Sequence, residues 1–272
     1  MASVFCTRLA AFATGTGTAE TAAQNVTPPA DAVELISVQM WATAKAPAPA
    51  ESVMGIGKLK GDNWSNPPYE VAAEIGSAHL GAIGGPFAPQ PRKWPANLPV
   101  TPNARIDFTY EPIDALADDG WVSAKFKWSN VKTGQQGLKR VFSREVPTST
   151  TTDSSVTIRD AASITKTYFG VGAATVAADD PGDYSITIEM TGIMEHPTTQ
   201  MNTQLIGIEA TSGLEISYLE EETVDLTLQP QVSQITPAVT LTETTALGTA
   251  GQWFYGFEYV PRSITFPNIV QT

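Results

Sequence analysis

The two halves of this 272-residue chain carry the same ordered series of short sequence features. The offset between paired features stays between about 131 and 137 residues and the order never changes, which is the signature of an internal duplication. Each pair is weak evidence alone, but several pairs in one order indicate that a single module occurs twice. The paired features are Val4-Phe5 with Val141-Phe142, Thr101-Pro102 with Thr236-Pro237, and Trp121 with Trp253.

The sequence favours short β-strands over helices. Its 21 glycines and 20 prolines interrupt the chain every few residues, and no dozen residues keep apolar side chains at the spacing of a helix. Alternation of polar and apolar residues, which is typical of strands with one buried face, is clearest at 104–110, 121–128 and 184–190. We therefore expect an all-β fold with few or short helices.

The duplication divides the chain into two expected domains, a first β-sandwich over residues 1–140 and a second over residues 141–272. The stretch from His79 to Pro99 has no close counterpart in the second half and is rich in glycine and proline. Such a composition disfavours regular structure, so we expect an insertion loop at about 79–99. Residues 261–272 are expected to form a C-terminal arm.

The formal net charge of −12 argues against direct nucleic-acid binding, because phosphate recognition depends on clustered lysine and arginine. The run from Lys125 to Arg144 is a local exception, since it holds several basic residues and no acidic one. Two interpretations stay open: a solvated basic face that balances acidic neighbours, or a face turned to anionic lipid or nucleic acid.

Cys6 is the only cysteine, so the chain can form no internal disulfide, no cysteine-based zinc site and no redox pair. No apolar run approaches the roughly 18 residues that span a bilayer. Arg8 interrupts the short apolar segment near the start, so we expect no cleaved signal peptide. The fold is expected to depend on packing alone.

The residue types that most often carry catalysis lack supporting spacing here. His79 and His196 lie in loop-like sequence without a second histidine at metal-ligand spacing, and no G-x-S-x-G elbow supports a catalytic triad. A carboxylate pair of the glycosidase kind could come from Glu111 and the acidic stretch, but contiguous acids on a strand usually keep an edge soluble. The acidic stretch comprises Glu220, Glu221, Glu222 and Asp225.

Asp179, Asp180 and Asp183 form an acidic turn that could bind Ca²⁺, although an Asx-type turn explains the same residues. Gly170-Val171-Gly172 lacks the third glycine and following helix of a phosphate-binding loop. We therefore predict no catalytic, cofactor-binding or metal-binding residues, and no enzyme activity.

The six tryptophans could form a sugar-binding platform, but most of them fall in expected strands, where burial is the simpler interpretation. Trp64 and Trp94 lie in proline-rich segments, so these two are the candidate contact residues. The tryptophans expected to be buried in strands are Trp41, Trp121, Trp128 and Trp253.

A duplicated β-sandwich with threonine-rich strands, long Pro/Gly loops, no cysteine framework and no active-site signature resembles the double jelly-roll major capsid proteins of tailless icosahedral double-stranded DNA viruses. The residues that carry the resemblance are the paired features of the two halves, Val4-Phe5 with Val141-Phe142, Thr101-Pro102 with Thr236-Pro237, and Trp121 with Trp253. The resemblance is architectural and covers nearly the whole chain.

The resemblance implies two tandem jelly-rolls and a homotrimer that tiles a pseudo-hexagonal lattice in the virion shell, after synthesis in the host cytoplasm. The implied partners are the chain itself, other capsid proteins such as vertex or minor proteins, and an internal membrane where the virus has one. The insertion loop would lie at the top of the trimer or at a subunit contact, residues 261–272 would clamp to a neighbour, and the 125–144 run would be a candidate inner face.

Two alternatives remain open from the sequence. An adhesive or carbohydrate-binding surface protein with two sandwiches would use the loop tryptophans and the glycosylation patterns at Asn25 and Asn63. A β-rich glycosidase or lyase would use the acidic residues, although no acid/base constellation is recognisable.

Overall fold

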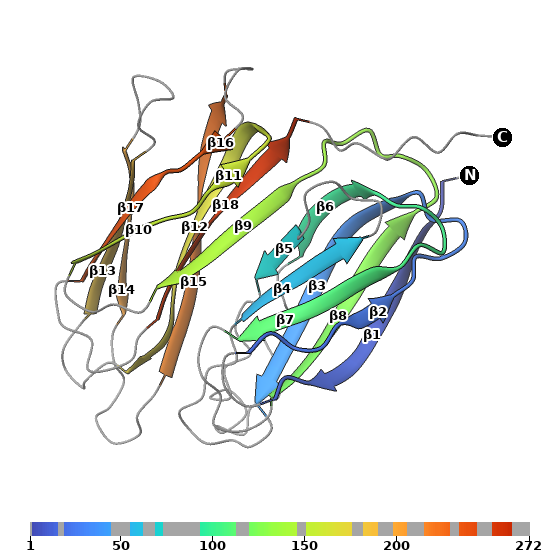
Figure 1. Ribbon diagram of the computed structural model, residues 1–272, viewed down its shortest axis with the longest axis horizontal. Coiled ribbons are helices and arrows are strands. Elements are labelled where there is room, and N and C mark those ends of the chain that lie inside the picture. Colours follow the sequence, from blue (N-terminus) through green and yellow to red (C-terminus); the bar gives the residue numbers. More distant parts are fainter. Residues whose placement is uncertain are drawn as a thin grey trace.

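A computed structural model describes most of the strands and the shorter connections, and every regular element in these residues is a β-strand. The expected all-β fold is confirmed. Figure 1 shows two β-sandwiches side by side, built from β1 to β8 and from β9 to β18. The described residues are 2–15, 19–44, 55–61, 69–72, 93–112, 120–145, 151–175, 182–189, 198–205, 215–228, 234–243 and 252–262.

The first sandwich consists of two four-stranded antiparallel sheets. The β1 sheet has the strand order β1-β8-β3-β6 and the β2 sheet has the order β2-β7-β4-β5. Its strands are β1 (Val4–Ala13), β2 (Gln24–Val26), β3 (Glu34–Ala44), β4 (Gly55–Gly61), β5 (Tyr69–Ala72), β6 (Trp94–Pro99), β7 (Ile106–Pro112) and β8 (Gly120–Ser129).

The second sandwich also has two four-stranded sheets, the β9 sheet in the order β9-β18-β12-β15 and the β10 sheet in the order β10-β17-β13-β14. A further two-stranded pair joins β11 to β16. The strands are β9 (Lys139–Glu145), β10 (Thr151–Ser155), β11 (Ile158–Arg159), β12 (Ala161–Thr175), β13 (Gly182–Glu189), β14 (Thr198–Leu205), β15 (Glu215–Thr227), β16 (Gln234–Ile235), β17 (Ala238–Glu243) and β18 (Gln252–Pro261).

The strand pairs are nested in both sandwiches. In the first, β1 pairs with β8, β2 with β7, β3 with β6 and β4 with β5; in the second, β9 pairs with β18, β10 with β17, β11 with β16, β12 with β15 and β13 with β14. Each half is therefore one long antiparallel hairpin rolled into two facing sheets, which is the jelly-roll topology. The same topology occurs twice, so the duplicated jelly-roll expected from the sequence is confirmed.

The paired sequence features fall at equivalent places in the two jelly-rolls. Val4-Phe5 and Val141-Phe142 lie on the first strands, β1 and β9. Thr101-Pro102 and Thr236-Pro237 precede β7 and β17, and Trp121 and Trp253 lie on the last strands, β8 and β18. The repeated sequence order therefore reflects a repeated order of strands.

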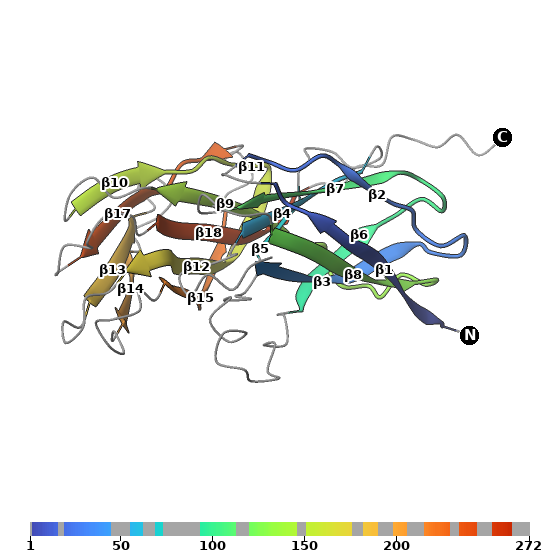
Figure 2. The same ribbon diagram turned by 90° about the horizontal axis from the view of Figure 1, so that it is seen from below.

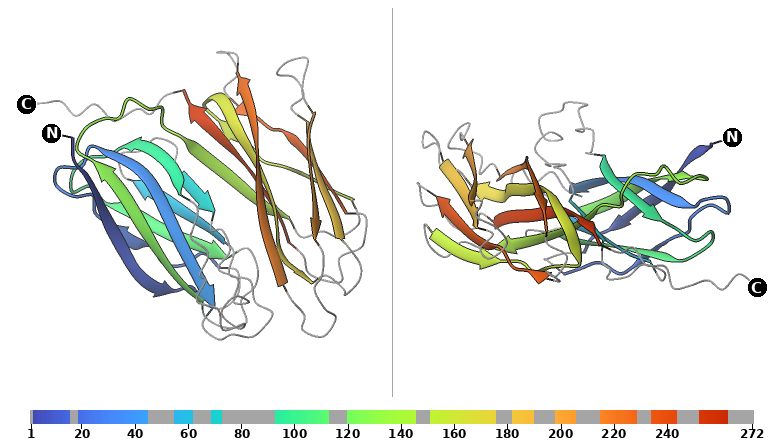
Figure 3. Two further views of the ribbon diagram at one scale, coloured as in Figure 1. Left: turned by 180° about the vertical axis from the view of Figure 1, so that it is seen from behind. Right: turned by 90° about the horizontal axis from the view of Figure 1, so that it is seen from above.

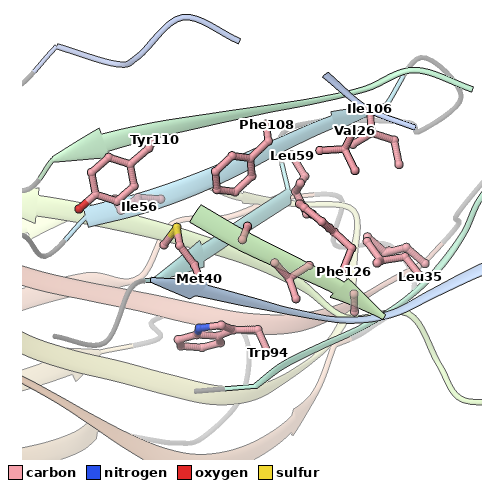
Figure 4. Packing of buried hydrophobic residues seen from close by; sticks show 14 of the residues in the cluster. Val26, Leu35, Met40, Ile56, Leu59, Trp94, Ile106, Phe108, Tyr110 and Phe126 are labelled. Atoms are coloured by element: carbon pink, nitrogen blue, oxygen red, sulfur yellow. The ribbon is translucent and has the colours of Figure 1, made fainter. Parts of the chain in front are cut away.

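Alternation along the strands builds the first core. On β7, Ile106, Phe108 and Tyr110 are at most 2% exposed and point between the sheets, where Met40 of β3 lies opposite them (Figure 4). Phe108 meets the Phe126 ring of β8 edge to face at 6.0 Å between centroids, an arrangement that stabilises aromatic pairs. A second buried cluster, which includes Ile164, Phe169, Tyr255, Phe257 and Tyr259, fills the other sandwich.

The prediction of an insertion loop at 79–99 is wrong for its last part, because Trp94–Pro99 forms strand β6. The two prolines, Pro95 and Pro99, are tolerated because, among the described strands, β6 lies at the edge of its sheet and pairs with β3 alone, and proline is compatible with such edges. Residues 79–92, and the expected C-terminal arm from residue 263 onward, lie outside the described residues.

The strand pairing changes between β8, which ends at Ser129, and β9, which begins at Lys139. The buried packing continues across this boundary, because Phe142 and Tyr168 of the second sandwich belong to the same buried cluster as the core of the first. The division into domains at residue 140 stays a prediction. Among the described residues, no helix has the length and apolar character needed to cross a membrane.

Candidate functional site: the joint between the two sandwiches

The two sandwiches meet where the side of the first, formed by β5 and β6, packs against the β9 sheet of the second (Figures 1 and 3). We call this contact the joint; it comprises Trp94 of β6, Arg140 and Phe142 of β9, Tyr168 of β12, and Gly256 and Glu258 of β18. On the β9 sheet these residues face away from the second core, because Val141, Phe257 and Tyr259 alternate with them and pack inward. The β9 sheet is therefore covered on both faces at this point.

Trp94 connects the two sandwiches. It is 1% exposed and lies at the lower end of the first core in Figure 4. Its ring centroid lies 6.1 Å from that of Phe142 and 5.4 Å from that of Tyr168, and these two rings are 5.5 Å apart. Because each such aromatic pair contributes about 0.5–1.5 kcal/mol beyond its buried area, the cluster holds the first sandwich firmly to the second.

Gly256 creates the space for Phe142. In the strand register it lies opposite Phe142 on one side and Tyr168 on the other. A Cβ atom at position 256 would collide with the ring of Phe142. The missing side chain therefore lets the Phe142 ring lie over β18 and reach Trp94 and Tyr168.

A buried ion pair lies next to the aromatic cluster. Nη2 of Arg140 donates to Oε2 of Glu258, its partner in the β9–β18 register, and their side chains are 2% and 4% exposed. Glu258 also accepts hydrogen bonds from the Tyr168 hydroxyl at 3.1 Å and the Thr165 hydroxyl at 2.9 Å. The Arg140 guanidinium carbon lies 5.1 Å from the Trp94 ring centroid, so the cation also interacts with the first sandwich.

The buried ion pair of the joint favours one arrangement of the two sandwiches more than it adds to the stability of the fold. Among the described residues, Nε of Arg140 has no hydrogen-bond partner, and neither does Oδ1 of Asn97 on β6. A buried ion pair whose hydrogen bonds are incomplete adds little net stability, but it disfavours arrangements that separate the two charges. Burial raises the pKa of Tyr168 well above its ordinary value of 10.0, so its hydroxyl remains a donor to Glu258.

Trp94 was expected to be an exposed contact residue in a loop, and that prediction is wrong, because its side chain is buried in the joint. The burial expected for Trp121 is also wrong: it is 42% exposed, whereas Trp128 on the same strand is fully buried. Residues separated by an odd number of positions on a strand point to opposite faces, so Trp121 and Trp128 cannot both face the core. Trp41 is half-buried on β3, and Trp64 and the Trp253 side chain lie outside the described part.

The basic run at 125–144 is divided between two surfaces and does not form one face. Its first lysines lie on the outer face of the β1 sheet, whereas Arg140 is committed to the joint. The exposed or half-buried members are Lys125, Lys127 and Lys132, and the buried ones are Lys139 and Arg140. The prediction of a single inner face from this run is therefore not supported by its geometry.

The two candidate carboxylates whose side chains are described lie in different sandwiches. Glu111 of β7 binds Lys58 at 2.6 Å in the first sandwich, and Glu221 of β15 binds Lys166 at 2.8 Å in the second. The side chains of Glu220, Glu222 and Asp225 lie outside the described residues, as do His79, His196, Asp179 and Asp180 and the side chain of Asp183. Gly170-Val171-Gly172 lies within strand β12. Within the described ranges, no three His, Cys, Asp or Glu side chains form a group that could hold a metal ion.

A second polar cluster ties the segment before β2 to the β2 sheet. Nζ of Lys58 on β4 lies 3.1 Å from Glu20 and 2.6 Å from Glu111, and the Thr109 hydroxyl donates to Glu20. Partial burial opposes ionisation of Glu20, but the hydrogen bonds from Thr109 and Lys58 outweigh it and lower its pKa below 4.5. Partial burial likewise opposes the charge on Lys58, and its bonds to Glu111 and Glu20 raise its pKa above 10.5.

Comparison with known proteins gives structural similarity only. No protein-family model and no curated protein sequence matches the chain. Among solved structures, the chain is similar to the major capsid protein P2 of bacteriophage PM2, with a TM-score of 0.42 and 11% identity over 96% of this chain and 97% of that one. It is also similar to a chain of broad bean stain virus, with a TM-score of 0.40 and 9% identity over 97% and 92%.

A third similar structure is VP54 of PBCV-1, fitted into a reconstruction of the virophage Sputnik, with a TM-score of 0.38 and 9% identity over 98% of this chain and 97% of that one. The first of these structures is described as a major capsid protein and the second as the structure of a virus. Since these TM-scores lie below 0.5, the functional proposal below rests on the repeated topology and the joint.

Proposed function

We propose that this chain is a viral major capsid protein that self-assembles as pseudo-hexagonal trimers into an icosahedral shell. The observation that carries the proposal is the joint, in which two copies of one jelly-roll pack side to face. The β5–β6 side of the first jelly-roll covers the outer face of the β9 sheet, which is the first-strand sheet of the second. Two copies of one module thus meet through unlike surfaces.

Within the described residues, this contact uses neither the outer face of the β1 sheet nor the β14–β15 side. The β1 sheet is equivalent to the β9 sheet, and the β14–β15 side is equivalent to the β5–β6 side. Figure 2 shows the two sandwiches extended along one axis, with β1 toward one end and β13 and β14 toward the other. A contact between unlike surfaces generates a closed ring if its rotation closes, and three chains with two jelly-rolls each would form a ring of six similar units.

The rest of the proposal follows from this assembly. The proposed location is the virion shell, after synthesis in the host cytoplasm, and the proposed partners are further copies, vertex or minor capsid proteins, and an internal membrane where one is present. Catalysis has no part in the proposal, nor does direct nucleic-acid binding. The adhesin alternative is weaker, because Trp94, one of the two loop tryptophans that supported it, is buried in the joint.

Light scattering coupled to size-exclusion chromatography of the full chain tests the proposal, with electron microscopy of the same fractions. We expect a species with three times the mass of one chain that appears as a six-lobed ring, and larger shells or sheets at high concentration. A chain that stays monomeric at every concentration, and that binds glycans as a monomer, would contradict the capsid function and favour the adhesin.

A further inference from the structure

The outer face of the β1 sheet carries an uncompensated positive charge. Arg8 of β1 lies directly opposite Lys125 of β8 in the strand register, and Lys127 lies two residues further along β8 on the same face. Arg8 and Lys125 are exposed and Lys127 is half-buried. We call these three residues the basic face.

Nothing within the described part of the chain neutralises the basic face. None of the ion pairs or hydrogen bonds found among those residues involves the side chains of Arg8, Lys125 or Lys127. Their neighbours across β1 and β3 are the uncharged Cys6, Ser37 and Gln39. Like charges directly opposite in an antiparallel pair are destabilising, so an anionic partner on this face would relieve a repulsion that the single chain retains.

The second sandwich shows what covers the equivalent face. The β9 sheet, whose strands occupy the same places as those of the β1 sheet, is covered on its outer face by the β5–β6 side of the first sandwich. The equivalent side of the second sandwich is formed by β14 and β15, and each is the terminal strand of its sheet. The β14–β15 side of a second copy would therefore cover the β1 sheet in the way that the β5–β6 side covers the β9 sheet.

The charge of β15 complements the basic face. Its sequence from Glu215 to Thr227 contains five carboxylates and no lysine or arginine. Glu221 is exposed on this strand and forms an ion pair with Lys166. An acidic edge strand and an uncompensated basic face thus lie on the two surfaces that the repeated topology would bring together.

We propose that the basic face of one copy docks on the acidic strand β15 of a second copy. This inference rests on the proposed self-assembly and specifies which surfaces make the contact. A nucleic acid or an anionic membrane is a weaker match, since the net charge of −12 would repel both over the rest of the surface.

Charge reversal in the full chain tests the contact. The variant Lys125→Glu/Lys127→Glu places two carboxylates opposite β15, and like-charge contacts at an interface are strongly unfavourable. We expect its dissociation constant for self-association, measured by analytical ultracentrifugation, to rise at least about 100-fold. The matched control Lys132→Glu/Arg159→Glu makes the same change in net charge at exposed positions elsewhere, and it should change the constant less than about threefold.

A compensating reversal on the other surface makes the test specific. Adding Glu221→Lys to the weakened variant places a cation on β15 at an exposed position whose side chain is described, at the cost of the ion pair with Lys166, and should restore part of the lost association. In the unaltered protein, zero-length carbodiimide coupling should join Lys125 or Lys127 to a β15 carboxylate. Mixing isotopically labelled and unlabelled chains identifies those links as intermolecular.

The outcomes separate this inference from the proposed function. Association of the wild type that Lys125→Glu/Lys127→Glu weakens no more than the control, with no link to β15, overturns the inference and leaves the capsid proposal intact. A wild type that stays monomeric overturns both. Binding of the wild type to phosphatidylserine vesicles or duplex DNA, lost in the variant while self-association is unchanged, assigns the basic face to a polyanion and also overturns the inference.

Discussion

The ring of Phe142 lies over Gly256, its partner across the β9–β18 pair, at a place where any side chain on residue 256 would collide with it. The contact matters beyond one strand pair, because Phe142 is also the residue through which β9 reaches Trp94 of the first sandwich. The joint therefore depends on a residue that contributes no side chain to it.

Replacing Gly256 by alanine should destabilise the protein by about 1–3 kcal/mol, since an added methyl group in a packed site forces its neighbours to move. Phe142→Ala removes the colliding ring at the cost of the aromatic cluster. The double variant should therefore lose less stability than the sum of the two single variants. Denaturant unfolding of all three variants measures this coupling, and strictly additive losses would show that the two residues do not interact as described.

Trp94→Ala should cost about 3–5 kcal/mol, because it removes a large side chain buried between two sandwiches. Trp121→Ala is the matched control, since Trp121 is 42% exposed, and its cost should stay below about 1 kcal/mol. Small-angle scattering adds a readout specific to the joint: only the Trp94 variant should show a larger radius of gyration. Equal effects of the two substitutions would argue against a joint centred on Trp94.

Removing one member of the buried ion pair should be costly. Arg140→Met leaves Glu258 buried without its cation and should destabilise the protein by about 3–5 kcal/mol. Arg140→Met/Glu258→Leu should recover part of this loss but not all of it, because the Tyr168 hydroxyl then lacks its acceptor, at about 1–3 kcal/mol. Adding Tyr168→Phe to the double variant should recover most of the remainder. Thermal unfolding of the series measures each step, and a single variant as stable as the wild type would refute the assignment.

Acid should loosen the cluster around Glu20. The pKa of Glu20 is lower in the folded protein than in the unfolded one. Its contribution to the free energy of unfolding is therefore fully present above the unfolded pKa of 4.5 and is lost as the pH falls through the folded pKa. Glu20→Gln should therefore cost about 0.5–1 kcal/mol at neutral pH and less at about pH 3, because protonation of the folded protein removes part of the contribution. The pH dependence has the opposite sign for Lys58. Because its folded pKa is raised, its contribution to the free energy of unfolding is present below pH 10.5 and is lost as the pH rises through the folded pKa.

The matched control for Glu20 is Asp31→Asn, an exposed carboxylate for which no ion pair or hydrogen bond is found among the described residues. Its stability difference from the wild type should not change between the two pH values. The measurement is urea unfolding at neutral pH and at about pH 3. A cost of Glu20→Gln that is the same at both would show that its charge is not what stabilises the cluster.

The duplicated all-β fold could be predicted because period-two alternation and the order of paired features are local properties of the sequence. Strands such as β7 and β8 place one residue in the core and the next outside it, and that pattern is visible without coordinates. Strand β6 was missed because its two prolines suggested a loop. Whether a proline-containing strand is an edge depends on which strands lie beside it, and that is decided by long-range pairing.

The joint could not be predicted, because its members come from four strands separated by up to about 160 residues. One signal was available: Gly256 and Glu258 interrupt the aromatic run of β18, and a glycine and an acid among Tyr255, Phe257 and Tyr259 mark a close approach and a buried partner. Nothing local pointed to Arg140, which looked like one of several cations in a basic run. Its partner lies 118 residues away.

The prolines of β6 have a consequence for how the two jelly-rolls remain separate. Pro95 and Pro99 have no amide hydrogen to donate, so the edge of the β1 sheet next to the joint is a poor template for a further strand. Backbone pairing with β9 would have merged the two modules into one continuous sheet and allowed strands to exchange between them during folding. The Ala96 carbonyl on this edge accepts a backbone hydrogen bond from Leu138, just before β9, and the side chains of the joint make the rest of the contact described above. The angle between the modules is therefore a property that substitution in the joint can adjust without rebuilding either fold.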